Sequence, residues 1–329
     1  MKKITKILSA FGPFLGLIFV YALFFIIAPY FDAPSFGSLL NTKTILAQTV
    51  IFGIGALGLT FVIIGDGIDL SAGSVVALGT VITALILKKF GGDHAGVFIT
   101  LLAALGGIAA CGACGFINGI TITGLRIVPF IVTLGMMQIG RGAALGFAGQ
   151  MPVNVPDSWL KSLMVAEPQM GVWYSIAPAV WIMLILLIVC SVILKYTVFG
   201  RYVFAVGSNE STARLCGINV PVLRIVIYSL AGLLVGVASV MQFSNLNQGD
   251  PSGAVGMELD FIAAVVIGGG SLSGGAGSAG GSIIGALIMA VLRNGCNMVG
   301  VPNYVQNIVV GFIIVAAVGL DRFKSAKQA

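Results

Sequence analysis

Long apolar segments recur along the whole chain and leave little room between them. A window of about 19 residues marks candidate membrane spans, and a helix needs about 20 mostly apolar residues to cross a bilayer. Ten such segments predict an all-α polytopic membrane protein, with one transmembrane domain over residues 1–329. The segments are 8–29, 45–64, 73–87, 96–116, 129–148, 177–195, 222–243, 258–270, 281–293 and 304–320.

The scarcity of charge excludes a soluble enzyme. The chain has 28 charged residues (17 Lys and Arg plus 11 Asp and Glu) among 329, whereas a soluble domain averages about 25%. The lone His94 has no catalytic constellation around it in the sequence, and no residue is assigned a catalytic or metal-binding role. The net charge of +6 comes from basic residues between apolar segments, where they act as orientation signals, so we expect no nucleic acid partner.

The distribution of Lys and Arg predicts the orientation. With the N-terminus inside, eleven of these residues fall in cytoplasmic segments and four in outer segments. Positive charge accumulates on the cytoplasmic side of membrane proteins, so both termini are predicted to be cytoplasmic. The eighth and ninth segments, 258–270 and 281–293, are short and flank a glycine-rich stretch. We therefore expect broken or re-entrant helices there, which is typical of backbone that lines a cavity.

Three motifs of soluble proteins occur in misleading places. The GxGxxG pattern over Gly53–Gly58 and the CxxC pattern over Cys111–Cys114 lie inside apolar segments, which favours helix packing over nucleotide or metal binding. The LSGG string over Leu272–Gly275 predicts a tight turn. No phosphate-binding loop of the form GxxxxGK[ST] exists in the chain, so we expect that it does not hydrolyse ATP.

Four glycine pairs have the GxxxG spacing of closely packed membrane helices. Such a pair forms either a contact between helices of one chain or a dimer face. With ten helices to pack, we expect a contact within the chain for any one pair. The pairs are Gly115 with Gly119, Gly142 with Gly146, Gly232 with Gly236, and Gly281 with Gly285.

The longest inner loop, residues 199–221, predicts one short cytoplasmic helix. Ser208 or Asn209 can accept backbone N–H bonds as the N-cap, and Glu210 favours the first turn. Arg214 lies near the end, where the helix dipole favours a positive charge, and Gly217 can terminate the helix. Caps at both ends make such a short helix stiff.

Four ordered blocks of this chain together resemble one known family. The first consists of Gly207, Asn209, Glu210, Ala213, Arg214, Gly217 and Ile218, and the others are Gly67–Ser74, Pro129–Met137 and Glu258–Gly277. These blocks resemble the inner-membrane permeases of monosaccharide ABC importers of the ribose, galactose and xylose type, and the first resembles the coupling helix of that family. The resemblance extends from about residue 45 to 321, and Thr212 departs from it, because the family more often has a small apolar residue there.

The resemblance implies a multi-pass subunit of the cell inner membrane that forms a homodimer around a central pathway. It implies that a monosaccharide is delivered by an extracytoplasmic binding protein and that a separate cytoplasmic ABC ATPase drives transport. ATP and Mg would then bind to that ATPase and no cofactor to this chain. Residues Ser208–Gly217, with Ala213 at their centre, would be the coupling helix that docks on the ATPase. Besides these partners, membrane lipid surrounds such a subunit.

Polar residues inside the predicted spans are candidates for the translocation pathway, since an ionisable group in a membrane is functional by default. Arg141 lies 12 residues beyond Pro129. It could bind sugar hydroxyls, pair with a carboxylate, or extend to the outer headgroups. Thr133, Met137, Gln138 and Arg141 share about one helical face, which makes this span the expected pathway lining, and Asn118 is a further candidate.

Two further groups of polar residues have open interpretations. Asp66 and Asp69 could couple transport to an ion, but a cap on the following helix, from Asp69 or Ser71, is the favoured interpretation. Gln242, Asn245 and Asn247 approach the outer end of the seventh span and could contact the binding protein or the emerging sugar; surface hydration explains them equally well.

The alternatives to a sugar importer subunit are an ion-coupled secondary transporter and an ABC permease for branched-chain amino acids. Buried carboxylates facing a cavity would favour the first of these, whereas a capped docking helix favours an ABC permease. The substrate alone distinguishes the second. The identity of the sugar is not encoded in any motif of this chain.

Overall fold

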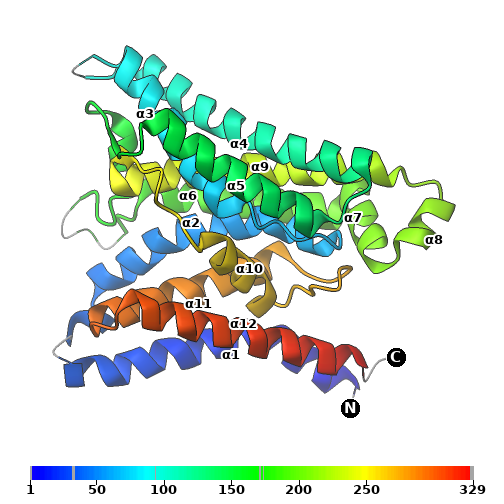
Figure 1. Cartoon of the computed structure of the whole chain (residues 1–329). Helices are drawn as coiled ribbons and strands as arrows, with labels where there is room; N and C mark the ends of the chain where they lie inside the picture. The colour runs from blue at the N-terminus through cyan, green and yellow to red at the C-terminus, as the bar shows by residue number, and fades with distance from the viewer. Residues whose placement is uncertain (1, 32–33, 93, 170–171, 173, 327–329) are drawn as a thin grey trace.

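The computed structural model of the chain describes residues 2–31, 34–92, 94–169, 172 and 174–326, and these form twelve α-helices (Figure 1). They are α1 (Lys2–Ile27), α2 (Leu39–Ile64), α3 (Ala72–Phe90), α4 (Val97–Leu125), α5 (Pro129–Ala148), α6 (Pro178–Tyr196), α7 (Val198–Ser208), α8 (Glu210–Leu215), α9 (Val220–Leu246), α10 (Met257–Ile267), α11 (Ala279–Met298) and α12 (Asn303–Ala326). Short 3₁₀ turns cover Ala28–Phe31, Pro34–Gly37 and Trp159–Ser162. Two short strands, β1 (Val153–Asn154) and β2 (Gln248–Gly249), pair antiparallel.

All ten predicted spans are helical, which confirms the all-α polytopic fold. Within the described residues, eight helices are long and apolar enough to cross a membrane. The eighth predicted segment is α10, whose 11 residues reach only about 16 Å at 1.5 Å per residue, so this span is interrupted as predicted. The ninth is α11, and the expectation that it is broken is wrong, because it runs without a break for 20 residues.

The helices form two outer groups around a central pair (Figure 1). Helices α3, α4, α5 and α9 pack together on one side, and α1, α11 and α12 lie on the other; α2 contacts both α9 and α11, and α10 contacts α2, α11 and α12. Both termini and α8 lie at the same end of the bundle in Figure 1. This arrangement agrees with an N-terminus and a C-terminus on the cytoplasmic side.

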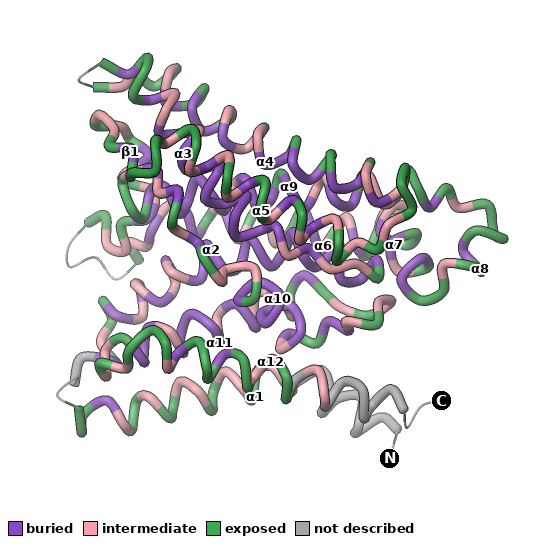
Figure 2. The backbone as a smooth tube through the Cα atoms, in the orientation of Figure 1, coloured by how far each residue is buried: buried purple, intermediate pink, exposed green. Residues whose placement is uncertain are grey.

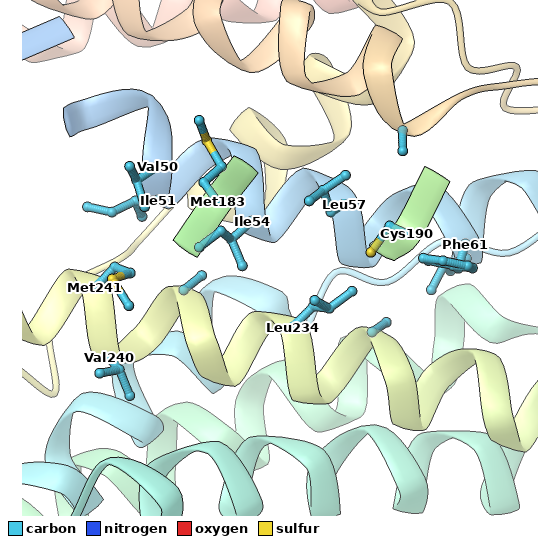
Figure 3. Close-up of a cluster of buried hydrophobic side chains, with 14 of the residues drawn as sticks. Val50, Ile51, Ile54, Leu57, Phe61, Met183, Cys190, Leu234, Val240 and Met241 are labelled. Carbon is cyan, nitrogen blue, oxygen red and sulfur yellow. The ribbon is translucent and has the colours of Figure 1, made fainter. Parts of the chain in front are cut away.

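Helix α2 forms the centre of the apolar core. It is apolar around its whole circumference and is buried from Asn41 onward over most of its length, whereas α1 and α12 at the periphery are largely exposed (Figure 2). A helix that is apolar on all sides is typical of a bundle centre or a membrane span. Figure 3 shows the side chains through which α2, α6 and α9 meet, among them Val50, Ile54, Leu57, Phe61, Met183, Cys190, Leu234 and Met241.

The most extensive helix packing is between α4 and α9, and it depends on small residues. A Cβ atom on Gly115 would lie 2.2 Å from the carbonyl oxygen of Tyr228, so the two backbones approach directly. Three of the four GxxxG pairs make close backbone contacts of this kind within the chain, as expected. The exception is Gly142 with Gly146 on α5, where an added Cβ would meet no described atom within 4 Å. This pair therefore faces outward.

The three misleading motifs are explained by packing and turns. The Gly53–Gly58 string lies inside α2, and Cys111 and Cys114 are buried in α4. Gly274 and Gly275 have φ values of +75° and +69° in the turn between α10 and α11, a conformation that favours glycine. The prediction of a tight turn at this LSGG string is confirmed.

Candidate functional site

The predicted cytoplasmic helix is α8, and its caps are as expected. The Asn209 side chain accepts a hydrogen bond from the Thr212 backbone N–H at 2.8 Å, so Asn209 rather than Ser208 is the N-cap. After the helix, Gly217 has φ +85°, and the Ile218 N–H returns to the Ala213 carbonyl at 3.1 Å. Ala213 is the buried residue of α8. The caps are confirmed, while docking on an ATPase stays a prediction.

The prediction of one helix in residues 199–221 is wrong, because the loop contains two. Helix α7 precedes α8 and was missed. Its N-cap is Thr197, whose hydroxyl accepts the Gly200 N–H at 3.1 Å. Thr197, a preferred N-cap residue, was the available signal, but it stood directly behind an apolar span. Val203 and Val206 bury one face of α7 against the bundle, so α8 is attached to a packed helix rather than to a free linker.

Glu210 links α8 to the base of α9. Its carboxylate accepts hydrogen bonds from Arg214 on the same helix, at 3.0 and 2.6 Å, and from Arg224 on α9 at 2.5 Å. Partial burial raises the pKa of the Glu210 carboxyl, but the hydrogen bonds and positive charges of Arg214 and Arg224 outweigh burial, so its pKa is lowered overall. The carboxylate is therefore charged at neutral pH, and the ion pairs persist.

A second link runs through the backbone at the junction of α7, α2 and the turn after α10. A Cβ atom on Gly207 would lie 1.7 Å from the Ile64 carbonyl oxygen and 2.7 Å from the Gly275 amide nitrogen. The Gly275 N–H in turn donates to that Ile64 carbonyl at 2.9 Å. We call this contact of Gly207, Ile64 and Gly275 the backbone junction. It places the end of α7 directly against the end of α2 and the turn that joins α10 to α11.

The predicted pathway residues of α5 do not all share one environment. Thr133 is buried and donates to the Ile68 carbonyl at 3.3 Å, Met137 and Arg141 are half-buried, and Gln138 is exposed. The face of α5 that packs in the bundle consists of Thr133, Met136, Gly140 and Ala144. Gln138 thus lies on the outward side of α5, and the pathway role of these residues stays a prediction.

Arg141 binds the irregular segment that precedes α10. Its guanidinium donates to the carbonyl oxygens of Pro251 and Gly253 at 2.8 and 2.7 Å. These partners lie 110 and 112 residues away in the sequence. The sequence did not predict a pair of loop carbonyls as the partners of Arg141. In this conformation the guanidinium holds residues 251–253 against α5, and only donors that it does not use here are available to a substrate.

Asn118 belongs to a buried polar network at the start of α3. Its amide donates to the Ser71 hydroxyl at 3.1 Å, and that hydroxyl donates to the Asp69 carboxylate at 2.6 Å. The Asp69 carboxylate also accepts the Ser71 N–H at 2.8 Å. Ser71 occupies the N-cap position of α3, as expected, but neither its side chain nor that of Asp69 accepts a hydrogen bond from the first turn of the helix, so the expected side-chain cap does not form. Asp69 instead stabilises the turn before it.

The three polar residues at the outer end of α9 separate by exposure. Asn245 and Asn247 are exposed, whereas Gln242 is buried, with 7% of its surface accessible. A contact of Gln242 with a binding protein would need a rearrangement of this end of the bundle. For Asn245 and Asn247 the contact stays a prediction. Nearby, the pairing of β1 with β2 ties the long outer loop to the segment after α9.

Two ion pairs, each with one buried partner, were missed in the sequence. Asp260 on α10 accepts hydrogen bonds from Arg293 on α11 at 2.8 Å through each carboxylate oxygen. Lys43 on α2, only 2% exposed, donates to Glu167 and to the Val172 carbonyl at 2.7 Å. The first pair fixes the interrupted span to a complete one. The second anchors the outer loop, and both join residues too distant in sequence for a local pattern to reveal.

Comparisons with known proteins show the family to which this helical bundle belongs. Residues 41–318 match the family described as branched-chain amino acid transport system / permease component. The chain belongs to this permease family. The ribose import permease protein RbsC of Escherichia coli is 38% identical over 299 residues, which are 89% of this chain and 88% of the relative. RbsC of Bacillus subtilis is 38% identical over 320 residues, which are 97% and 95%.

A third relative, the L-arabinose transport system permease protein AraH of Escherichia coli, is 33% identical over 309 residues, 94% of this permease and 90% of the relative. No solved structure gives a significant match. The permease is therefore a transport component rather than an enzyme, and it is a multi-pass protein of the cell membrane, as the apolar segments predicted.

Proposed function

We propose that this permease forms the membrane pathway of an ATP-driven ABC importer for a monosaccharide, which an extracytoplasmic binding protein delivers. The observation that carries the proposal is the similarity over 89% or more of the chain to permeases named for ribose and L-arabinose. The four sequence blocks support it independently of those names. Which monosaccharide is carried depends mainly on the binding protein in this design, so ribose and L-arabinose are the first substrates to test.

Helix α8 is the docking element for a cytoplasmic ATPase in this proposal. It protrudes from the end of the bundle at which both termini lie (Figure 1), and its Leu215 side chain is 88% exposed. A large apolar side chain at the tip of a cytoplasmic helix is more stable in an apolar groove of a protein partner than in contact with water. Movement of α8 reaches the membrane helices through the Glu210 ion pairs and the backbone junction.

ATP and Mg bind the partner ATPase in this proposal. The sequence of the permease contains no phosphate-binding loop, and a P-loop ATPase needs one to hold the nucleotide phosphates. ATP-driven closure of two ATPase subunits then moves α8 as a rigid body. No cofactor of the permease itself takes part.

We further propose that two copies of the permease form a homodimer with the pathway between them, lined by α5. The outward glycines Gly135, Gly142 and Gly146 support this arrangement, since an added Cβ at each would meet no described atom within 4 Å. Small residues on an otherwise unoccupied helix face allow a second helix to approach closely. In such a dimer Gln138 would face the partner copy or the pathway.

Disulfide crosslinking tests the homodimer. A Gly146→Cys variant, made together with Cys216→Ser because Cys216 is the exposed native cysteine, is expected to form a crosslinked dimer in membranes. The control places the cysteine on the lipid-facing side of another span, at Val189 of α6, which is 45% exposed. Equal crosslinking of both variants, or of neither, would contradict a dimer through α5.

Reconstitution tests the transport function. The permease is co-purified with a candidate ATPase that has a phosphate-binding loop, placed in proteoliposomes with the binding protein, and tested for ATP-dependent uptake of labelled ribose, L-arabinose and leucine. We expect sugar uptake that stops without ATP. Sugar uptake by the permease alone, driven by an ion gradient, would contradict the proposal of an ATP-driven importer. Uptake of leucine but of neither sugar would show that the substrate is an amino acid.

A matched pair of variants tests the docking helix in the same system. Leu215→Ser removes the exposed apolar side chain from α8 and is expected to abolish co-purification of the ATPase. Leu125→Ser makes the same change at the cytoplasmic end of α4, where Leu125 is 67% exposed, and is expected to leave co-purification unchanged. Co-purification that survives Leu215→Ser would place the docking surface elsewhere.

A further inference from the structure

A polar pocket of about 620 Å³ lies at the cytoplasmic base of the bundle, between the docking helix and the turn that joins α4 to α5. Its volume falls in the range of about 300–1,000 Å³ that is typical of small-molecule sites. The pocket is formed where the turn between α4 and α5 faces α8 and the start of α9. Its polar side chains are Thr123, Arg126, Glu210, Arg214 and Arg224.

The charge of this arginine pocket is positive. Three guanidinium groups line it, against the one carboxylate of Glu210, which already pairs with both Arg214 and Arg224. Asp66, outside the lining, also acts on Arg224 electrostatically. Arg126 has no ion-pair partner within the described part of the chain. The pocket therefore retains unbalanced positive charge after both acidic groups are counted.

The backbone adds to this positive potential. Helix α5 begins at the pocket wall with Pro129, its N-cap Val128 offers no side-chain acceptor, and its first turn has no acidic residue. The N-terminus of a helix carries roughly half a positive charge, which is normally balanced by a cap, an acidic side chain or an anion. Here the first two are absent, and the helix end faces the same space as Arg126.

The residues around the pocket are typical of a binding site for a lipid rather than for a soluble anion. Apolar side chains next to the arginines are exposed on the outside of the bundle: 67% for Leu125, 62% for Val128 and 54% for Val222. They continue directly into the exposed apolar surfaces of α4 and α9, which lie outside the proposed dimer face of α5 and face the hydrocarbon in a membrane. A ligand with a phosphate group and acyl chains matches both the pocket and this surface, and basic pockets between membrane helices on the cytoplasmic side are of the type that binds anionic headgroups.

We propose that the arginine pocket binds the phosphate of an anionic phospholipid, with Arg126 as its principal ligand and Arg214 and Arg224 as supporting ligands. The acyl chains lie along the exposed apolar residues of α4 and α9. Because Arg214 and Arg224 also hold Glu210, the bound lipid contacts the same ion pairs that attach α8 to α9. This inference concerns the permease alone and does not depend on which sugar is carried.

Native mass spectrometry of the purified full chain in detergent tests the site. The probes are dioleoylphosphatidylglycerol, dioleoylphosphatidylcholine and inorganic phosphate. We expect retention of phosphatidylglycerol in preference to phosphatidylcholine, and no displacement by inorganic phosphate at equal concentration. Arg126→Gln is expected to weaken phosphatidylglycerol binding about fivefold, the effect of one basic residue at a membrane surface. Arg201→Gln removes an exposed charge from the same side of the protein but outside the pocket and should change nothing.

A second variant protects the test against misfolding of the first. Val128→Glu leaves every arginine in place and adds a carboxylate at the pocket wall, and it should weaken phosphatidylglycerol binding by a similar factor. Three outcomes would overturn the proposal: equal binding of the two lipids, equal loss with Arg126→Gln and Arg201→Gln, or displacement of the lipid by inorganic phosphate. A fourth is loss of ATPase co-purification with Arg126→Gln in lipid-free detergent, which would assign the pocket to a carboxylate of the partner protein.

Discussion

The cytoplasmic segment α7–α8 and the interrupted span α10, taken together with the irregular segment 250–256 before it, are held in place in opposite ways. In α8 the cap and the ion pair join residues three and four apart, Asn209 with Thr212 and Glu210 with Arg214. In the interrupted span, Arg141 reaches its carbonyl partner across 110 residues and Arg293 reaches Asp260 across 33. The docking helix is thus specified locally and exposed, whereas the interrupted span depends on the surrounding bundle.

This difference is consistent with the proposed roles. A helix that a partner protein must recognise needs a fixed shape before the partner binds, and local caps supply it. A broken helix inside a membrane has backbone groups that water cannot satisfy, so other parts of the protein must satisfy them. We therefore expect substitutions in the interrupted span to affect the stability of the whole permease, and most substitutions in α8 to act locally.

The largest effect is expected at the buried ion pair of the interrupted span. Asp260→Asn leaves the Arg293 guanidinium without its carboxylate, and losing one partner of a buried pair costs about 3–5 kcal/mol of unfolding free energy. Denaturant unfolding of the purified permease in detergent measures it. Asp157→Asn, at a side chain 66% exposed in an outer loop, is the control and should stay within about 0.5 kcal/mol. A change below 1 kcal/mol in Asp260→Asn would contradict the dependence on this pair.

The next largest effect is expected at the backbone junction, the one place where the cytoplasmic segment should behave like the membrane core. Gly207→Ala puts a Cβ atom 1.7 Å from the Ile64 carbonyl oxygen, so backbone must move, at an expected cost of about 3 kcal/mol. The same unfolding measurement applies. Gly142→Ala on α5 meets no described atom within 4 Å and should not destabilise the monomer. A well-folded Gly207→Ala variant would show that the junction can open.

The third prediction tests whether Arg141 has a structural role, through its hydrogen bonds to the segment that precedes α10. Arg141→Gln removes two charge-assisted hydrogen bonds to residues 251 and 253, and we expect local opening to become easier by about 2 kcal/mol. Hydrogen exchange of the amides between residues 249 and 257 measures this opening. Arg141→Lys keeps the charge, but its flexible side chain positions the donor nitrogen less precisely than the planar guanidinium does, so it should recover only part of the protection. Unchanged exchange in Arg141→Gln would contradict a structural role for this half-buried charge.

The same contrast explains what could be predicted from the sequence. The ten apolar segments, the orientation and the caps of α8 follow from periodicity, charge and local hydrogen bonds, and all of these are local properties. The partners of Arg141, the Asp260 pair with Arg293 and the Lys43 pair with Glu167 are created by tertiary packing, so no spacing rule could find them. Helix α7 was missed because its apolar face reads as a continuation of the preceding span.

A smaller and local effect is expected at the cap of the docking helix. Asn209→Ala removes the acceptor for the Thr212 N–H, and loss of an N-cap costs about 1 kcal/mol, or about a fivefold increase in amide exchange over residues 211–215. Asn219→Ala removes the same kind of cap from α9, but that helix is held by packing and its exchange should change little. Global unfolding should be nearly unaffected in both variants. Equal exchange changes in α8 and α9 would contradict the local character of α8.

The smallest effect is expected from protonation of Glu210. Because its pKa is lowered in the folded protein, the ion pairs with Arg214 and Arg224 stabilise the attachment of α8 fully above the unfolded pKa, which is about 4.3 for a glutamate. That stabilisation is lost as the pH falls through the folded pKa, since the folded carboxylate then takes up a proton. Between pH 8 and 5 the exchange of α8, corrected for its intrinsic rate, should therefore stay constant, and it should rise only below about pH 4. Glu210→Gln should remove this pH dependence. A transition near neutral pH would mean that another titrating group, and not Glu210, controls how firmly the docking helix is attached.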